Sequence, residues 1–541
     1  MSSQAEKRVC IIGAGPVGLT LALRLSDFGV GSVVFDENPG LKKEGSKACL
    51  IQGDALEILD KSNCGDRIYR EGVPWTHSNV YIRGTNITRT EYGLNNRFGP
   101  FVNISQYRIE QILLEEILRR SNISIEWSSR IVKVDQSDEK VIVEIDTGAG
   151  SEIRAFPYAV ACNGARSNVR DLVGVKWNGY RHTARFLITD IKAKLPFAKE
   201  RHFHFDPPFN RGYQVIMHPQ PDDVWRIDWQ LPPEIDIEVD KANGSLERRI
   251  RSVIGDVEYR LEWLSVYRFQ QRTAERFIKG RVMFAGDAAH ALPPYGSRGM
   301  NSGIQDADNL AWKLALVTQG CAAPALLDTY HCERAAAAEE NIAVTERTIR
   351  FMVPSNPLVR LRRKLFFVLA RRFRPFRKYV NSGTMAKPHR YIASPLVQAP
   401  VLSPVVGMFA ADANIHVAGK TLKLRELLGR GFTFVYVGEQ APRVLPALQG
   451  SQVPLGSFEL SAIVLSSGHG RSHSTPAMRN IHVARANESV LRNYEKDKWH
   501  LIRPDMHVAG VYDFHSQDEF DAALWGSSLL AGPGVTQRLV V

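Results

Sequence analysis

Three glycines near the start of the chain stand where a phosphate-binding turn needs them. Gly13, Gly15 and Gly18 follow an apolar run and open an amphipathic stretch, and Asp36 ends a second apolar run. Gly13 permits a tight turn, Gly15 lets the backbone approach a pyrophosphate, and Gly18 lets the next helix pack close to the strand. The amides that begin this helix can bind phosphate, and Asp36 can accept from a ribose hydroxyl. The pattern predicts dinucleotide binding; a glycine-rich turn without a ligand is the alternative.

A second strand-and-turn segment lies far along the chain, at residues 281–290, and carries Asp287 at the end of its strand. Between the two segments, residues 180–270 alternate in the manner of an antiparallel sheet. The nucleotide-binding domain of a dehydrogenase is normally one contiguous block. The split therefore favours a flavoprotein in which the first segment holds ADP and the distant loop holds the ribityl chain.

Length and composition bound the remaining choices. The chain has 541 residues, 44% hydrophobic and 23% charged, which are ordinary values for a globular protein of several domains. Its six cysteines form no C-x-x-C pair and no cluster with zinc spacing, so we expect a reducing compartment and no metal. The sequence shows no signal peptide and no run of 18 apolar residues, so we expect a cytoplasmic protein without a membrane span.

The formal net charge of +12 is concentrated in one segment. Residues 357–380 carry nine Lys or Arg and no acid, and apolar residues interleave with them. This predicts a basic amphipathic helix that ends before Pro375. It is either a surface helix that links two domains or a helix with weak affinity for a membrane surface. No nucleic-acid-binding motif accompanies the charge, so we expect no nucleic-acid partner, although the positive field helps to collect anionic ligands such as NAD(P)H.

Three motifs in order resemble one enzyme family. They are the Gly13–Gly18 turn, the segment Asn163–Arg170, and Ala285–His290 followed by Gly299–Trp312. Together they resemble the FAD-dependent aromatic hydroxylases, the single-component flavoprotein monooxygenases of the para-hydroxybenzoate hydroxylase family. The resemblance covers nearly the whole chain and is greatest to the subgroup with an extra C-terminal domain, which includes phenol hydroxylase and 3-(3-hydroxyphenyl)propionate hydroxylase.

The resemblance implies an α/β fold: a Rossmann-like FAD-binding domain of the GR2 type, an inserted antiparallel β-sheet substrate domain, and a C-terminal thioredoxin-like domain. The FAD-binding domain is expected at 1–178, with a short substrate-domain excursion at about 75–102, and again at 271–350. The sheet domain is expected at 179–270, a basic helical linker at 351–394 and the last domain at 395–541. Because this last domain has no cysteine, we expect packing or oligomerisation from it rather than dithiol chemistry.

The resemblance also assigns roles to further residues. Asp287 would accept from a ribityl hydroxyl, with a helix N-cap as the alternative. Gly299 and the backbone of Asn301 would lie near the pyrimidine end of the flavin. Lys47 and Gln106 match positions close to FAD, although both could be ordinary loop residues.

Two departures from the family pattern concern the site. Asn163 stands where the family usually has Asp, which keeps an acceptor but removes the charge. Arg298 precedes Gly299 where close relatives are smaller or neutral. It would hold an anionic substrate or the phosphate of NAD(P)H, or else point to solvent.

The implied reaction is hydroxylation of a phenol with NADH or NADPH and O₂, through a flavin C4a-hydroperoxide. Cys49 occupies the position where phenol hydroxylase carries an aspartate, so the group that orients the phenol must lie elsewhere. Tyr213 is predicted to orient the phenolic oxygen and Arg211 an anionic group. The other candidates on the sheet are His204, His218 and Arg226.

The sequence leaves the aromatic open among carboxylated phenols, nitro- or halophenols and polyketide phenols. The expected partners are a small phenolic molecule and O₂, with a homodimer as one expected assembly. Halogenation or epoxidation on the same scaffold is an alternative function. A non-catalytic membrane-surface protein that retains FAD is another.

Overall fold

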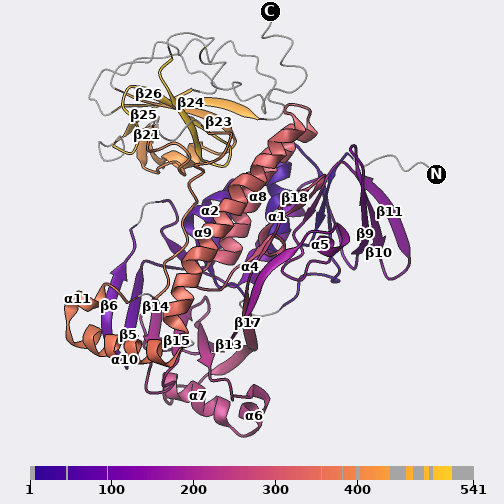
Figure 1. Cartoon of the computed structure of the whole chain (residues 1–541). Helices are drawn as coiled ribbons and strands as arrows, with labels where there is room; N and C mark the ends of the chain where they lie inside the picture. Colours follow the sequence, from indigo (N-terminus) through magenta and orange to yellow (C-terminus); the bar gives the residue numbers. More distant parts are fainter. Residues whose placement is uncertain are drawn as a thin grey trace, which may run out of the picture.

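A computed structural model describes residues 7–43, 47–93, 96–354, 356–380, 382–397, 403–417, 419–438, 458–466, 481–486, 492–514 and 519. Within them the chain forms three large layers (Figure 1). A parallel sheet and its helices occupy the middle, a long and mainly antiparallel sheet lies below, and the C-terminal sheet lies above. The predicted α/β class, with an antiparallel sheet within 180–270, is confirmed.

The central sheet has the order β18-β19-β12-β1-β2-β8, and every pairing except β18–β19 is parallel. Helix α1 packs on its short apolar strands, and α4 and α8 pack beside α1. The strands are almost wholly buried. The elements are β1 (Val9–Ile12), α1 (Pro16–Asp27), β2 (Ser32–Phe35), α4 (Gln106–Ile117), β8 (Ile123–Glu126), β12 (Ala159–Ala161), α5 (Val169–Leu172), β18 (Ile278–Lys279), β19 (Val282–Phe284) and α8 (Arg298–Thr318).

The lower sheet has eight strands in the order β20-β17-β13-β16-β15-β14-β5-β6. Alternate residues of its central strands pack against helices α6 and α7 on one face, which leaves the other face for the nucleotide-binding domain. The elements are β5 (His77–Ile82), β6 (Thr85–Glu91), β13 (Trp177–Lys192), β14 (Arg201–Phe205), β15 (Gln214–Pro219), β16 (Val224–Leu231), α6 (Ile237–Ala242), α7 (Ser245–Ile254), β17 (Arg260–Ala274) and β20 (His290–Ala291).

Two small antiparallel sheets complete this part of the chain. One consists of β9 (Arg130–Gln136), β10 (Val141–Asp146) and β11 (Ser151–Phe156). The other, in the order β3-β7-β4, consists of β3 (Leu50–Gln52), β4 (Val73–Trp75) and β7 (Phe101–Asn103), with α2 (Gly53–Asp60) and α3 (Gly65–Glu71) beside it.

The long helix α9 (Asp328–Met352) runs across the molecule beside α8 and leads into α10 (Pro357–Arg372) and α11 (Arg374–Arg377) (Figure 1). The basic helix therefore ends before Pro375, as predicted. Among the described helices, none combines the length and apolar character needed to cross a membrane.

The C-terminal sheet has the order β22-β21-β25-β24-β23-β26-β27. Its strands are β21 (Asn414–Val417), β22 (Lys420–Lys423), β23 (Gly431–Val437), β24 (Glu459–Ser466), β25 (Ile481–Ala486), β26 (Lys498–Ile502) and β27 (Val508–Tyr512). Part of the predicted domain 395–541 lies outside the described residues. The described strands are mixed: β23, β24 and β25 run parallel, while β26 and β27 form an antiparallel hairpin.

Candidate active site

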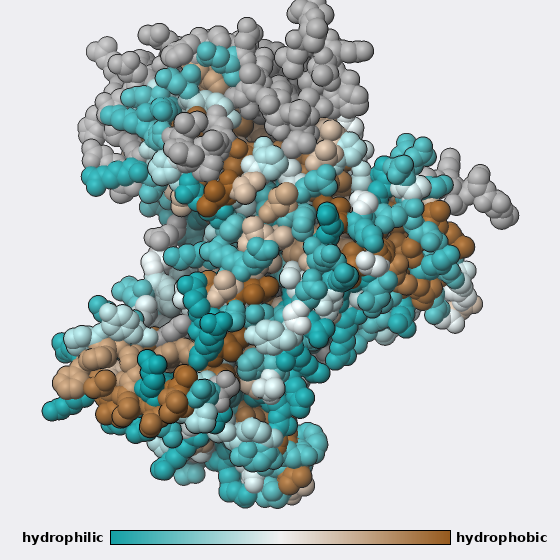
Figure 2. Space-filling view, in the orientation of Figure 1, coloured by the Kyte–Doolittle hydropathy of each residue, from teal (hydrophilic) through white to brown (hydrophobic). Residues whose placement is uncertain are grey.

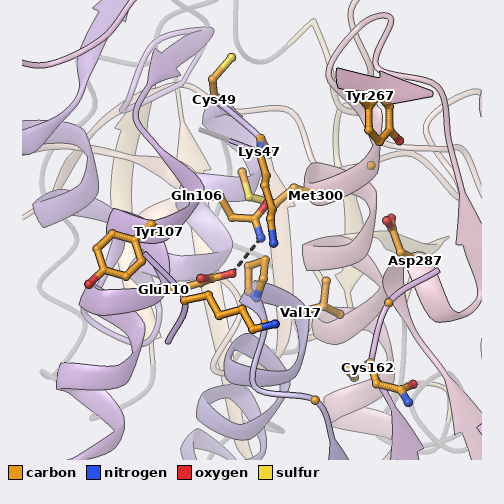
Figure 3. Close-up of a pocket in the computed structure, with 18 of the residues that line it drawn as sticks. Val17, Lys47, Cys49, Gln106, Tyr107, Glu110, Cys162, Tyr267, Asp287 and Met300 are labelled. Atoms are coloured by element: carbon orange, nitrogen blue, oxygen red, sulfur yellow. Dashed lines mark hydrogen bonds between the residues drawn. The ribbon is translucent and has the colours of Figure 1, made fainter. Parts of the chain in front are cut away.

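A cavity of about 820 Å³ lies between the nucleotide-binding turn and the free face of the eight-stranded sheet. Figure 3 shows Lys47 and Gln106 on one wall and Tyr267 and Asp287 on the opposite wall. Of the residues predicted from sequence, the cavity is lined by Gly13, Gly15, Asp36, Lys47, Gln106, Asn163, Asp287, Arg298 and Gly299. Its volume falls in the range of small-molecule and cofactor sites.

The first turn has the backbone geometry that a pyrophosphate requires. Gly13 has φ +108°, and a Cβ there would lie 2.8 Å from the backbone of Asn163. A Cβ on Gly18 would lie 2.0 Å from the carbonyl oxygen of Gly13, so Gly18 serves helix packing and does not line the cavity. A Cβ on Gly15 would meet nothing within 4 Å, which leaves its backbone open to the cavity. The turn therefore fits the pyrophosphate of FAD.

Replacing Gly15 tests this turn. Because Gly15 has the extended backbone of a helix N-cap, with φ −77° and ψ −179°, Gly15→Val is compatible with the fold but fills the space at the turn. We expect FAD affinity to fall at least about tenfold, or about 1.4 kcal/mol, measured by titration of the apoprotein with FAD. Gly150→Val is the control, because its Cβ also meets nothing, and Gly150 lies in the turn between β10 and β11, outside the cavity lining. Equal affinities for both variants would contradict this use of the turn.

Asp36 follows β2 at the cavity edge and is already engaged by the backbone. Its Oδ2 accepts from the Ala14 amide at 2.8 Å, and its Oδ1 accepts from the backbone and side-chain nitrogens of Asn38 at 2.9 and 2.7 Å. The carboxylate thus joins the glycine turn to the end of the second strand. This arrangement places it where a ribose hydroxyl could also donate to it.

Gln106 begins α4 and is held by two hydrogen bonds. Its side-chain oxygen accepts from the Ala48 amide at 3.3 Å, and its nitrogen donates to Glu110 at 2.8 Å (Figure 3). Lys47 lies on the segment that this contact anchors, and its side chain is exposed toward the cavity. The pair presents one cation and one amide to a bound nucleotide.

Asp287 and Gly299 lie on the opposite wall. A Cβ on Gly299 would lie 3.7 Å from Oδ1 of Asp287, so the two residues are neighbours at the start of α8. The side chain of Asp287 is exposed only where it faces the cavity. The surrounding protein still removes water from the carboxyl and raises its pKa; His290 opposes this effect and Asp306 adds to it. The Asn163 amide donates to Asn168 at 3.2 Å, and its buried oxygen has no partner within the described residues. That orphan acceptor is available to a ligand donor.

Asn301 does not line the cavity. Its side-chain oxygen accepts from the Gln52 amide at 2.8 Å, and its nitrogen donates to the carbonyls of Leu50 at 3.2 Å and Ser297 at 2.7 Å. The side chain therefore fastens α8 to β3. This fixes the backbone of the adjacent Gly299 and Met300, which do line the cavity.

A buried charge cluster that the sequence reading missed supports the second loop. Asp306 on α8 accepts from the Gly286 amide at 2.9 Å, from His290 at 2.7 Å and from Arg334 at 2.6 Å. Although burial raises the pKa of Asp306, His290 and Arg334 outweigh that effect and lower it to about 2. The ionised carboxylate thus holds the turn that presents Asp287.

The sheet wall is built from alternate residues of its strands. Phe186 and Ile188 of β13, Ile216 and His218 of β15, and Arg226 and Asp228 of β16 line the cavity, as do Ser265 and Tyr267 of β17. Their neighbours Leu187, Val215, Met217, Ile227 and Trp229 pack on the opposite face. His218 and Arg226, two of the predicted candidates, are therefore at the cavity.

Tyr213 and Arg211, predicted to orient the phenol and an anionic group, lie away from this cavity, as does the further candidate His204. Tyr213 and Arg211 belong to the turn before β15, whereas the cavity lies along Ile216 and His218 further down this strand. Tyr213 also shares strand parity with Val215 and Met217, which face α6 and α7.

Arg201 is the basic residue that the sequence reading missed. It begins β14, is 5% exposed, and lines the cavity. Its guanidinium donates to the hydroxyl of Ser78 at 3.3 Å and the carbonyl of Ser382 at 2.8 Å, and it forms no ion pair with a carboxylate of the described residues. Burial lowers its pKa. In the sequence, Arg201 stands at the start of an alternating strand. An ordinary arginine at the edge of a sheet has the same pattern, so the sequence alone does not single it out.

His218 lies among the basic groups of this wall. Burial lowers its pKa well below the usual range, and the charges of Arg201 and Arg226 lower it further. The buried Nδ1 of His218 has no hydrogen-bond partner within the described part of the chain. Arg226, in contrast, is paired with Asp228 at 2.8 Å. The wall therefore holds one balanced ion pair, one neutral histidine and the cation of Arg201.

Arg298 lines the cavity but does not point to solvent. It is 4% exposed and donates to Asn341 and to the carbonyl of Thr384. Burial lowers its pKa to about 10, so it stays charged near neutral pH. Cys49 is also buried in the wall, where burial raises the pKa of its thiol to about 11. It is therefore a neutral thiol and cannot replace an aspartate base.

A nucleotide-binding α/β domain whose cavity is closed on one side by a separate, mainly antiparallel sheet fits a flavoprotein oxidoreductase, and comparison with known proteins agrees. A family model described as an FAD binding domain matches residues 6–345. A 3-(3-hydroxy-phenyl)propionate/3-hydroxycinnamic acid hydroxylase from Mycobacterium sp. (strain JLS) is 29% identical, covering 96% of this chain and 91% of the relative. A 6-methylpretetramide 4-monooxygenase from Streptomyces rimosus is 31% identical, covering 70% and 68%.

The fold agrees with these relatives. The crystal structure of the flavin-dependent monooxygenase PieE, in complex with FAD and substrate, matches with a TM-score of 0.77, 21% identity and 98% coverage of both chains. The chain belongs to the FAD-binding family of aromatic hydroxylases.

Proposed function

We propose that this hydroxylase acts on a phenol that also carries an anionic group, with NADH or NADPH as reductant and O₂ as the oxygen source. The observation that carries the proposal is Arg201, a buried guanidinium at the cavity with no carboxylate partner among the described residues. A buried cation is costly unless it is paired. An aromatic carboxylate that entered the cavity would supply the missing charge, and the propionate and cinnamic acid named for one relative are of this class.

The cavity residues have separable tasks under this proposal. The Gly13–Gly15 turn, Asp36 and Asp287 hold FAD, which supplies the redox and oxygen chemistry when bound. Arg201 binds the substrate anion, with Nδ1 of His218 as an adjacent polar contact. Tyr267 lies on the same sheet face, with its exposed surface toward the cavity, and can hydrogen-bond the phenol. Desolvation by the surrounding protein, with the charge of Asp287, raises its pKa to about 12, so it keeps its proton. Arg298 attracts the phosphate of NAD(P)H.

The proposal is tested by anaerobic reduction of the FAD-loaded enzyme with NADH or NADPH. Matched pairs of hydroxyaryl acids and their methyl esters would be added, and the loss of flavin absorbance would be followed. We expect an acid to accelerate reduction and its ester to do so far less, and a hydroxylated product to appear once O₂ is admitted. Halogenated or epoxidised products, or no response to any phenol, would overturn it.

We further propose that the C-terminal sheet is a thioredoxin-like domain without redox function. The parallel pair β23–β24 beside the antiparallel hairpin β26–β27 supports this. The absence of cysteine beyond Cys332 excludes dithiol chemistry there. The predicted domain boundaries, at 178, 270, 350 and 394, and a homodimer remain proposals of the same kind.

A further inference from the structure

Helix α10 carries an apolar stripe on the side that faces away from the protein. Leu358, Leu361, Leu365 and Val368 recur at helical spacing and are 70%, 55%, 58% and 52% exposed. The stripe continues into Phe373 and Phe376, at 49% and 37%. Figure 2 shows the resulting brown surface over α10 and α11. Monomeric proteins rarely leave large contiguous apolar surface in water without a function.

The opposite side of α10 anchors it to the body of the protein. Phe367 and Ala370, one turn apart, are the buried residues of this helix. The ring of Phe367 lies 5.1 Å from that of Phe205 in the eight-stranded sheet, and Arg363 donates to the carbonyls of Phe351 and Met352. The outward stripe therefore contributes little to packing among the residues that the structure describes. Its leucines are held in a fixed orientation by the buried face.

Cations flank the stripe. On a helical projection, Arg362 lies on one side of it and Lys364 and Arg371 lie on the other, and all three are exposed. Segment 357–380 contains nine Lys or Arg and no acid. An outward apolar stripe bordered by cations is the pattern of a helix that lies in a membrane interface, where leucines enter the acyl boundary and cations meet anionic headgroups.

We propose that α10 and α11 dock the enzyme on an anionic lipid surface without crossing it. The charge favours this occupant over a second copy of the chain, because a symmetric dimer through the stripe would bring two sets of cations together. The proposal rests on the exposed helix alone and is independent of the substrate proposed above.

Co-sedimentation of the full-length, FAD-loaded protein with vesicles tests the proposal. We expect binding to phosphatidylcholine vesicles that contain phosphatidylglycerol and little binding to phosphatidylcholine alone. The variant R362Q/K364Q/R371Q removes three cations, each worth about fivefold in partitioning, so the affinity should fall roughly a hundredfold. The variant L361Q/L365Q/V368Q keeps the charge and should lose a comparable factor.

Matched controls separate this surface from general effects. K140Q/K176Q/K194Q removes three exposed cations elsewhere, and L118Q/I153Q/V239Q removes three exposed apolar side chains elsewhere; both should bind like the original protein. Unaltered flavin absorbance shows that each variant is folded. Failure of the original protein to sediment with anionic vesicles would overturn the proposal. Unchanged sedimentation of L361Q/L365Q/V368Q would overturn it too. It would also be overturned if, without lipid, the original protein were a dimer and L361Q/L365Q/V368Q a monomer.

Discussion

Replacing Glu333 with Gln is expected to destabilise the protein by about 3–5 kcal/mol, because it strands buried cations. Glu333 on α9 accepts from Arg503 at 2.6 and 2.9 Å, from Lys313 at 2.6 Å and from Asn309 at 2.7 Å. Arg503 also donates to Asp505. In Glu333→Gln, the guanidinium of Arg503 and the ammonium of Lys313 would lose a charge partner in a site that water does not reach.

The cluster also joins two parts of the chain. Lys313 and Glu333 belong to the helices of the FAD-binding region, whereas Arg503 and Asp505 follow β26 of the C-terminal sheet. Loss of Glu333 should therefore loosen the C-terminal sheet as well as lower the melting temperature. Calorimetry, with limited proteolysis of the C-terminal region as a second readout, measures both effects.

A surface pair on the same helix provides the control. Glu346 contacts Arg350 at 2.6 Å, with side chains 40% and 74% exposed, so Glu346→Gln should cost at most about 0.5 kcal/mol. The double variant E333Q/R503Q should cost less than the sum of the single changes, since no charged Arg503 is left behind. A Glu333→Gln protein as stable as Glu346→Gln would show that the cluster does not hold the two parts together.

The loss of stability in Glu333→Gln should depend on pH in a definite direction. Burial raises the pKa of Glu333, but Arg503 and Lys313 outweigh burial and hold it well below its usual range. A carboxylate with a depressed pKa contributes stability above its ordinary pKa of about 4.3 and loses that contribution as the pH falls toward its folded value. The difference in free energy of unfolding between the original protein and Glu333→Gln should therefore be largest at pH 7 and should decrease only below about pH 4.

The nucleotide-binding turn could be read from the sequence because its requirements are local. Gly13 needs a positive φ, Gly18 needs space against the carbonyl of Gly13, and both demands fall within one short segment. The support that Asp306 gives to Asp287 was not readable in the same way. Its partners Gly286, His290 and Arg334 meet only when α8 and α9 pack against the second loop.

The sheet wall was harder to predict for a different reason. Both faces of the eight-stranded sheet are covered, one by α6 and α7 and the other by the cavity, so alternation alone does not reveal which face meets the substrate. For this reason Tyr213, which does not line the cavity, was chosen to orient the phenol, and Arg201, which does, was overlooked. Helix α10 shows the same ambiguity, because an amphipathic pattern does not say that its apolar stripe points outward.

Replacing Arg201 with Met should lower kcat/KM for a hydroxyaryl acid about a hundredfold, equivalent to about 2.7 kcal/mol. Met keeps an unbranched apolar stem but has neither the charge nor the donors that would bind the carboxylate. The methyl ester of the same acid offers no charge to Arg201, so its kcat/KM should change only a few-fold. Steady-state kinetics on both substrates give the ratio that isolates the charge.

The acid-to-ester ratio also distinguishes recognition from structure. Arg201 donates to the carbonyl of Ser382, so its loss could shift the segment that leads to Met385 in the cavity wall. Such a shift would lower the rates with acid and ester equally, whereas loss of an anion contact lowers only the rate with acid. Arg83→Met, at an exposed pair with Asp206 beside the same sheet, should leave both rates unchanged. If Arg201→Met lowers kcat/KM equally for the acid and the ester while flavin stays bound, Arg201 is a structural residue. The substrate anion would then have no proposed partner.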